Sequence, residues 1–229
     1  MQKPSPIVLN LIILNVLVYL AQQLVSPFDV TEWGALHYYK SSLFKPHQFI
    51  THMFLHDKGG IGHLLFNMFG LWMFGTSLES YIGSKKFLVF YLICGLGAAA
   101  LTQLTVPFSA SNFAKSAEAI KIAMDNNVNT AQIADVYAQQ YSMIGASGAI
   151  MGVMAAFAYL FPNTEMFIMF IPVPIKAKYV IPGFVLIDLF GGLRQSAGDN
   201  VGHFAHLGGA LIGFLLIWYW NKTNRKSFY

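Results

Sequence analysis

The chain has 229 residues, of which 55% are hydrophobic and only 10% are charged, and its formal charge is +4. This composition excludes an ordinary water-soluble domain, because charged residues normally supply about a quarter of such a sequence. The charges gather between long apolar runs, which is typical of a chain that crosses a membrane several times. The basic excess is therefore not a signal for nucleic-acid binding.

The first apolar run covers residues 6–25 and predicts a membrane-spanning helix. This run is longer than the apolar region of a usual signal peptide, and no clear small-residue cleavage site follows it, so we interpret it as a retained helix. The next stretch, 26–48, mixes aromatic and polar residues and is typical of a loop that lies at the membrane interface.

Five further apolar runs predict spanning helices. They cover about 61–78, 87–105, 146–161, 179–193 and 203–220. The fifth predicted span, 179–193, contains Pro182, Gly183 and Asp188, so we expect a weak helix that is broken near its start. The run 167–173 is too short to cross a membrane and is expected to belong to a turn. The sequence thus predicts an all-α, polytopic membrane helical bundle with six transmembrane helices and an interfacial first loop.

A polar stretch at about 106–143 separates the third and fourth predicted spans. Apolar residues recur at helical spacing before and after the polar break at 126–129, which predicts a small helical hairpin outside the membrane. We interpret the whole chain, 1–229, as a single membrane domain that carries this polar extramembrane insertion. We favour amphipathic cover over a binding site as the role of the hairpin.

The distribution of Lys and Arg predicts the orientation in the membrane. Six spans put both termini on one side, and that side carries eight basic residues: Lys3, Lys85, Lys86, Lys176, Lys178, Lys222, Arg225 and Lys226. The other side carries six, offset by seven acidic residues. Both termini are therefore predicted to be cytoplasmic. No organelle presequence is visible, so we expect an integral, multi-pass protein of a bacterial plasma membrane.

The sequence Gly145-Ala146-Ser147-Gly148-Ala149 opens the fourth predicted span. Small neighbours on both sides leave the Ser147 hydroxyl unshielded. Gly148, Gly152 and Ala156 then share one helix face and would allow another helix backbone to approach closely. Taken alone, this pattern fits a packing stripe as well as it fits a catalytic serine.

Four other polar residues are expected at the same depth as Ser147, because the second, fourth and sixth spans all begin on the outer side. His63 and Asn67 share one face of the second span, and His203 and His206 begin the sixth. Polar groups inside hydrocarbon are costly and usually face a polar cavity. These residues therefore indicate a polar site near the outer membrane face.

A second stripe of small residues, Gly209 and Gly213, follows His206 in the sixth span. If this stripe packs on Gly148 and Gly152, the serine comes within hydrogen-bond reach of His206. For His203, which lies on the same face, we favour a structural role.

A hydroxyl beside an imidazole is an activated nucleophile, because the imidazole accepts the proton as the oxygen attacks a carbonyl. The amide of Asn67, the ring of His63 and backbone N–H groups at the helix start can stabilise the resulting oxyanion. We expect a dyad of Ser147 and His206, since no acidic third member is predicted at this depth. Asp188 is interpreted as a polar contact between helices.

Together these residues resemble the rhomboid family of intramembrane serine proteases, over the second to the sixth spans. The matching motifs are Gly-Ala-Ser147-Gly-Ala, Ala205-His206-Leu207-Gly208-Gly209 followed by Gly213, His63-x-x-x-Asn67 and Gly75-x-x-x-Glu79-x-x-x-Gly83. The resemblance implies that Ser147 is the nucleophile and His206 the general base, with His63 and Asn67 stabilising the oxyanion. It further implies hydrolysis of peptide bonds in transmembrane substrates near the outer membrane face.

Two positions depart from the family pattern. His47-Gln48 stands where many members have Trp-Arg, so the anchoring of the first loop is expected to differ. Met151 stands where an aromatic residue often packs on the histidine; methionine can fill the space but gives softer support.

The residues indicate neither a metal nor a cofactor, since the single cysteine, Cys94, lies in an apolar run and the histidines lack metal-ligand spacing. The expected partners are membrane-spanning protein substrates and the lipid bilayer, without nucleic acid, and the oligomeric state is left open. Two other functions remain as alternatives: a catalytically silent module that binds membrane helices, and a channel or transporter. Retention of both Ser147 and His206 disfavours the first, and the lack of an obvious inverted repeat disfavours the second.

Overall fold

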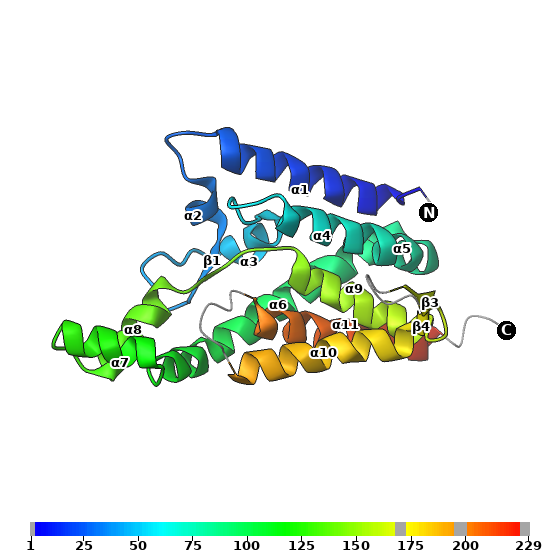
Figure 1. Cartoon of the computed structure of the whole chain (residues 1–229). Coiled ribbons are helices and arrows are strands. Elements are labelled where there is room, and N and C mark those ends of the chain that lie inside the picture. The colour runs from blue at the N-terminus through cyan, green and yellow to red at the C-terminus, as the bar shows by residue number, and fades with distance from the viewer. Residues whose placement is uncertain (1–2, 168–172, 195–200, 225–229) are drawn as a thin grey trace.

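The computed structural model describes residues 3–167, 173–194 and 201–224, and these ranges are mostly helical (Figure 1). The elements are α1 (Pro6–Leu24), α2 (Val30–Gly34), β1 (Leu36–His37), α3 (Gln48–Thr51), the 3₁₀ turn η1 (His52–Phe54), α4 (Gly62–Gly70), the π-helical turn η2 (Leu71–Gly75), α5 (Thr76–Ile82), α6 (Ser84–Phe113), α7 (Ala117–Asp125), α8 (Thr130–Gln140), β2 (Ser142–Met143), α9 (Ser147–Leu160), β3 (Glu165–Met166), β4 (Ile175–Lys176), α10 (Ala177–Arg194) and α11 (His203–Asn224). β1 pairs antiparallel with β2, and β3 with β4. The predicted all-α class is confirmed.

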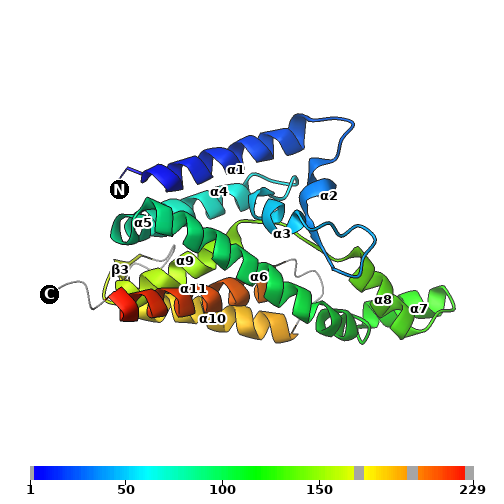
Figure 2. The same ribbon diagram turned by 180° about the vertical axis from the view of Figure 1, so that it is seen from behind.

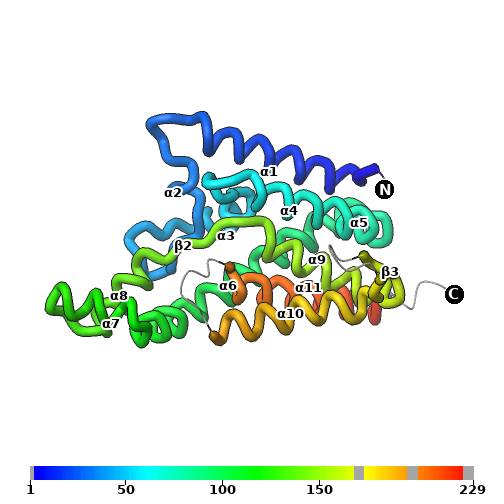
Figure 3. Tube along the Cα trace, viewed as in Figure 1, coloured from blue at the N-terminus to red at the C-terminus, as the bar shows by residue number. Residues whose placement is uncertain are grey.

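The long helices form a bundle in which α9 and α11 pack on α6, while α10 covers α11 and α9 from one side (Figures 1 and 2). The continuous segment α4–η2–α5 packs on α9, and α1 covers it from the other side. The tube in Figure 3 shows the start of α1 and the last turns of α11 at one end of the bundle and the α7–α8 pair at the opposite end. α4, α9 and α11 all begin at the end that faces α7 and α8, so their first turns lie at a similar level.

Three of the described helices, Pro6–Leu24, Ser84–Phe113 and the segment His203–Thr223 of α11, are long and apolar enough to cross a membrane. α9 is apolar but shorter. A membrane helical bundle therefore agrees with the structure, whereas six crossings remain a prediction.

Glycines let the backbones of α9 and α11 touch. A Cβ added at Gly209 would lie 1.7 Å from the carbonyl oxygen of Gly148, and one at Gly213 would lie 2.4 Å from that of Gly152. Such distances leave no room for a side chain on either helix. These two helices are therefore held at their closest possible separation.

α1 is attached to the rest of the bundle through Glu79 of α5. The Glu79 carboxylate accepts hydrogen bonds from the backbone amides of Ile7 and Val8, at 3.0 and 2.9 Å, and from the hydroxyl of Ser5. The hydroxyl of Ser84 donates a further bond of 2.6 Å. Glu79 thus caps the first amides of α1, where a helix has no internal acceptors and favours a negative charge.

Gln48, one of the two departures from the family pattern, anchors the first loop from a buried position. Its side-chain oxygen accepts from the amides of His37 and Lys45, at 3.3 and 3.1 Å, and its nitrogen donates to the carbonyl of Leu43 at 3.1 Å. The ring of the preceding His47 stacks on Trp33 with centroids 4.3 Å apart. A neutral amide therefore satisfies the loop backbone here without a charged side chain.

The third predicted span ends near Thr105, but the helix itself, α6, continues through Pro107 to Phe113, into the stretch that was expected to lie outside the membrane. Pro107 removes one backbone donor, but Val106 and Ala110 are buried against the first loop and α8. Burial of this continued apolar face outweighs the local effect of the proline.

The polar stretch 106–143 contains α7 and α8, which the turn at 126–129 joins. Both helices are capped at their starts: the Ser116 hydroxyl accepts from the amide of Ala119, and Asn129 forms a reciprocal capping box with Gln132. The location of this hairpin outside the membrane, and the interpretation of 1–229 as a single domain, remain predictions.

α10 is continuous from Ala177 to Arg194, so the expected break at Pro182-Gly183 is wrong. The start of the helix is secured from outside, because the amides of Ala177 and Lys178 donate to the carbonyls of Thr164 and Pro162. These bonds satisfy two amides of the first turn, which have no acceptor within α10. Parts of two predicted loops, 168–172 and 195–200, lie outside the described residues.

The predicted topology can be tested with two introduced cysteines. Cysteines at Ser116 and at Lys222 should react with a membrane-impermeant maleimide from opposite sides of intact membranes, because three of the six predicted crossings separate the hairpin from the end of α11. The native Cys94 is buried and contributes little background. Labelling of both positions from outside would contradict six crossings with cytoplasmic termini.

Candidate active site

Ser147 is the first residue of α9, and the geometry of the preceding glycine places it there. Gly145 has φ +125°, a conformation that side chains disfavour, and its amide donates to the carbonyl of His52 at 2.9 Å. The chain then turns directly into α9 through Ala146. This hydrogen bond ties the serine-bearing turn to the first loop.

Ser147 and His206, far apart in the sequence, meet across the α9–α11 contact. The Oγ of Ser147 lies 2.8 Å from Nε2 of His206. Both residues are in the first turn of their helices, directly above the glycine contacts that join α9 to α11. The two side chains are partly exposed, so a substrate can reach the hydroxyl.

Asp188 of α10 also reaches this site, which we did not predict. Its Oδ1 lies 3.0 Å from Nδ1 of His206 and 2.8 Å from Nδ1 of His203. The expectation that no acidic side chain lies near the serine–histidine pair is therefore wrong, whereas the interpretation of Asp188 as a helix–helix contact is correct. A signal was present: Asp188 precedes the last residue of α10 by six positions and His206 follows the first residue of α11 by three, so both lie within two turns of the same end of the bundle.

His63, on α4, is also close to Ser147. Its Nδ1 accepts from the amide of Asp57 at 3.3 Å, which leaves Nε2 as the protonated nitrogen of a neutral ring. A Cβ built on Gly145 would lie 3.2 Å from that Nε2 and 3.6 Å from the Ser147 Oγ. The ring nitrogen and the hydroxyl therefore flank the same small space.

Asn67 lies one turn after His63 and is nearly buried. Its Nδ2 donates to the carbonyl of His63 at 2.9 Å, which uses one of the two hydrogens of the amide. The second hydrogen of Nδ2 is available on the side chain, which lines the same cavity as Ser147.

The cavity around these residues has a volume of about 1140 Å³. Its walls come from several elements: Phe66 and Gly70 of α4, Met151 and Met154 of α9, and Gly192 of α10. It also extends beneath the hairpin, where Ser116, Glu118, Tyr137 and Tyr141 line it. The hairpin thus forms part of the cavity wall and is more than a cover of the bundle.

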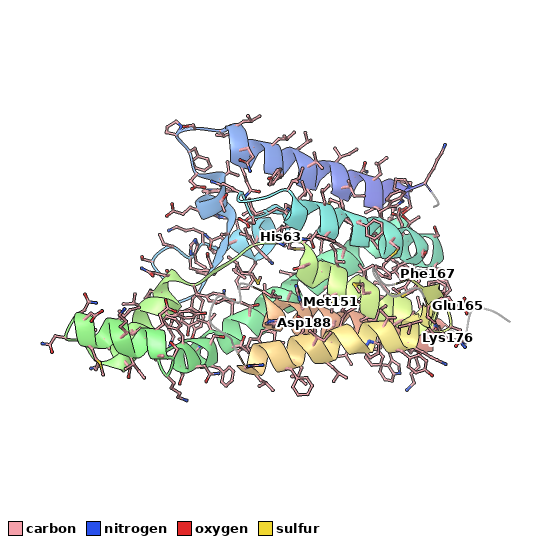
Figure 4. All side chains as sticks on the ribbon, viewed as in Figure 1. His63, Met151, Glu165, Phe167, Lys176 and Asp188 are labelled. Carbon is pink, nitrogen blue, oxygen red and sulfur yellow. The ribbon has the colours of Figure 1, made fainter. Side chains whose placement is uncertain are left out.

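Figure 4 labels His63, Met151 and Asp188, which lie in the middle of the bundle, away from the β3–β4 ribbon. Met151 is one helical turn after Ser147 and is 7% exposed. It lines the cavity at the position where many members of the family have an aromatic residue.

Two buried histidines of the first loop support the site without charge. Burial lowers the pKa of His52 to about 4 and that of His56 to about 4, so both rings are neutral at physiological pH. Nδ1–H of His52 donates to the carbonyl of Gln48 at 2.8 Å, and the ring of His56 packs edge-on against His63 at 5.1 Å. Among the described residues, no group of three His, Cys, Asp or Glu side chains could hold a metal ion.

The family model of the Rhomboid domain matches residues 44–223, which include every residue of this site. The chain belongs to the rhomboid family. The match covers α3 to α11 and agrees with the resemblance seen in the sequence motifs.

Relatives of this rhomboid chain include mitochondrial and bacterial proteins. Rhomboid protein 1, mitochondrial, of Saccharomyces cerevisiae is 32% identical over 166 residues, which cover 72% of this chain and 40% of the yeast protein. Rhomboid protease AarA of Providencia stuartii is 31% identical, covering 91% of this chain and 70% of that protein. Rhomboid protease GluP of Bacillus subtilis is 30% identical, covering 68% and 22%.

This chain therefore spans less than half the length of the yeast and Bacillus relatives. An integral membrane protein agrees with the family and with the apolar helices. The bacterial plasma membrane and the cytoplasmic termini remain predictions, because the relatives include both mitochondrial proteins and proteins of bacteria.

Proposed function

We propose that this rhomboid chain is an intramembrane serine endopeptidase in which Ser147 is the nucleophile and His206 the general base. The observation that carries the proposal is the distance of 2.8 Å between the Ser147 Oγ and Nε2 of His206. The pair lies at a partly exposed position in a large cavity, where a peptide carbonyl can approach the hydroxyl.

In the first step, the Ser147 oxygen attacks the carbonyl carbon of the scissile peptide bond while its proton passes to Nε2 of His206. His206 then gives this proton to the leaving amine nitrogen, which breaks the C–N bond and leaves an acyl-serine. Water, activated by the same nitrogen, hydrolyses the ester and regenerates Ser147. The steps follow in this order because one nitrogen, Nε2 of His206, serves first as the base toward Ser147 and then as the acid toward the leaving amine.

The negative oxygen of the tetrahedral intermediate needs donors on the side of Ser147 that faces α4. Nε2–H of His63 flanks this space, and the second hydrogen of the Asn67 amide lies one turn away. The first amides of α9 add further donors, because the first turn of a helix has no internal acceptors. These groups support His63 and Asn67 as oxyanion-stabilising residues.

The proposed substrates are membrane-spanning proteins that are cleaved near the outer membrane face. The cavity has one wall on α4 and another on α10, and apolar side chains are exposed on both helices, including Phe66 at 68% and Phe190 at 69%. An apolar substrate helix can therefore contact these helices from the lipid and enter the cavity sideways. The backbone of a substrate helix is enclosed by its own hydrogen bonds. The helix must therefore unwind locally before one of its peptide bonds can reach Ser147.

A silent module that only binds membrane helices is the alternative function. It would not need Ser147 hydrogen-bonded to an imidazole in an accessible cavity. A serine-directed phosphonate separates the two functions, because only the peptidase should react covalently at Ser147.

The catalytic pair is tested by single and double substitutions. Ser147→Ala and His206→Ala should each abolish nearly all cleavage of a transmembrane substrate in detergent, and the double variant should lose little more, because the two residues act as one unit. Ser147→Ala should fold normally, since it exchanges small residues at a site of small residues. Thermal unfolding of each purified variant checks the fold.

The matched control is His203→Ala, which removes the same ring one turn earlier in α11. It should retain measurable cleavage, because Nε2 of His206 stays beside the Ser147 Oγ and Asp188 keeps its hydrogen bond to Nδ1 of His206. If His206→Ala were active and His203→Ala inactive, the assignment of His206 as the general base would be wrong. Full cleavage by both Ser147→Ala and His206→Ala would contradict the proposed peptidase function.

Asn67→Ala tests the proposed oxyanion site. Loss of one donor commonly lowers turnover by about 10²–10³-fold, so we expect the turnover of Asn67→Ala to fall by this factor. The phosphonate should still label Ser147 completely, but more slowly. Steady-state cleavage and labelling rates of the same preparation provide the two measurements. A normal cleavage rate would mean that backbone amides and His63 hold the oxyanion without Asn67.

Replacement of exposed residues on α10 tests sideways entry. Phe184 and Leu186 are 38% and 53% exposed, so truncation of either to alanine removes little packing. Phe184→Ala or Leu186→Ala should preserve or raise the rate of cleavage of a transmembrane substrate, because a smaller side chain loosens the opening beside α10 through which the substrate enters. Loss of cleavage with an unchanged unfolding temperature would show that α10 is a structural wall and not a gate.

A further inference from the structure

Asp188 is a buried carboxylate in an apolar helix, and both of its described hydrogen bonds go to histidines at the start of α11. The residue is 6% exposed. An isolated charge at such a place is costly, and hydrogen bonds to two ring N–H groups offset that cost. The position of Asp188 therefore depends on His203 and His206, and the orientation of these rings depends on Asp188.

The carboxylate determines which nitrogen of each ring carries the proton. An ionised carboxylate can only accept hydrogen bonds, so Nδ1 of both rings must be the donor toward Oδ1 of Asp188. In a neutral ring Nε2 is then the acceptor, and on His206 it faces the hydroxyl of Ser147 at 2.8 Å. This is the tautomer that a general base needs in order to accept the serine proton.

Close packing of α10 on α11 fixes the distance between Asp188 and the rings. A Cβ at Gly191 would lie 2.4 Å from Cε1 of His203, and one at Gly192 would lie 3.3 Å from the Cβ of His203. A side chain at Gly191 would overlap the His203 ring and one at Gly192 would be tight, so the two helices pack closely enough to hold Asp188 within hydrogen-bond distance of both rings.

We propose that Asp188 is a positioning residue that holds His206 in the tautomer and orientation required to activate Ser147. This inference rests on the proposed function and adds a group that acts through His206. During attack the proton moves from the Ser147 Oγ to Nε2 of His206, the imidazolium keeps its Nδ1–H bond, and Asp188 stays ionised and stabilises the new positive charge. The proton then leaves with the amine.

The test is Asp188→Asn, which preserves size and can still form a hydrogen bond between α10 and α11. Its amide can donate to Nδ1 of His206, which would move the ring proton to Nε2 and block acceptance of the serine proton. We expect kcat to fall by about 10²–10⁴-fold with KM unchanged, and phosphonate labelling of Ser147 to slow in parallel. Asp188→Glu should recover part of kcat because it restores a carboxylate.

The matched control is Ile187→Ala, which changes the neighbouring residue of α10, whose side chain is 64% exposed. It should leave kcat unchanged. A kcat of Asp188→Asn equal to that of the parent, with normal folding, would overturn the proposal and leave only a structural tie. If Ser147→Ala also cleaved the substrate, the proposed function would fail as well, so the two failures can be distinguished.

Nitrogen NMR of the histidine rings tests the inference if Asp188→Asn does not fold. In the otherwise unaltered chain, assigned by comparison with His206→Ala, the neutral ring of His206 should carry its proton on Nδ1. A proton on Nε2 would overturn the proposal.

Discussion

The direct backbone contact between α9 and α11 is the constraint on which the site depends. Because a Cβ at Gly209 would lie 1.7 Å from the carbonyl oxygen of Gly148, any side chain there would push the helices apart. Ser147 and His206 begin the two helices, so such a shift would lengthen their 2.8 Å contact directly. Misplacement of catalytic groups by about 1 Å can cost 10²-fold in rate, so the proposed reaction depends on these glycines as well as on the polar residues.

The serine depends equally on the first loop. Gly145 donates to the carbonyl of His52, and the side chain of His52 in turn donates to the carbonyl of Gln48, whose own amide side chain satisfies the loop backbone. This series of hydrogen bonds runs from the buried Gln48 to the turn before α9. The loop therefore supports the turn that carries Ser147, although the loop itself supplies no group to the proposed reaction.

Much of the site could be predicted because it depends on local spacing. The apolar runs predicted the long helices, and two glycine stripes that start on the same side predicted the meeting of Ser147 and His206. The partners of Asp188 could not be predicted in this way, because they depend on how α10 is rotated against α11, and Gly191 and Gly192 set that rotation only after packing. The extension of α6 past Pro107 has a similar cause, since the first loop and α8 bury its continued face.

The first helix lies outside the 44–223 match to the family, yet hydrogen bonds hold it at both ends. At its start the Glu79 carboxylate caps its amides, and near its end the side chain of Gln22 exchanges two hydrogen bonds with the backbone of His56, at 2.9 and 3.0 Å. The 19 residues between Pro6 and Leu24 span about 28 Å at 1.5 Å per residue. The length of α1 thus fixes the distance between its attachment to α5 and its attachment to the segment before α4. A replacement helix that was one turn shorter or longer would have to leave Glu79 or the His56 backbone buried without its partner.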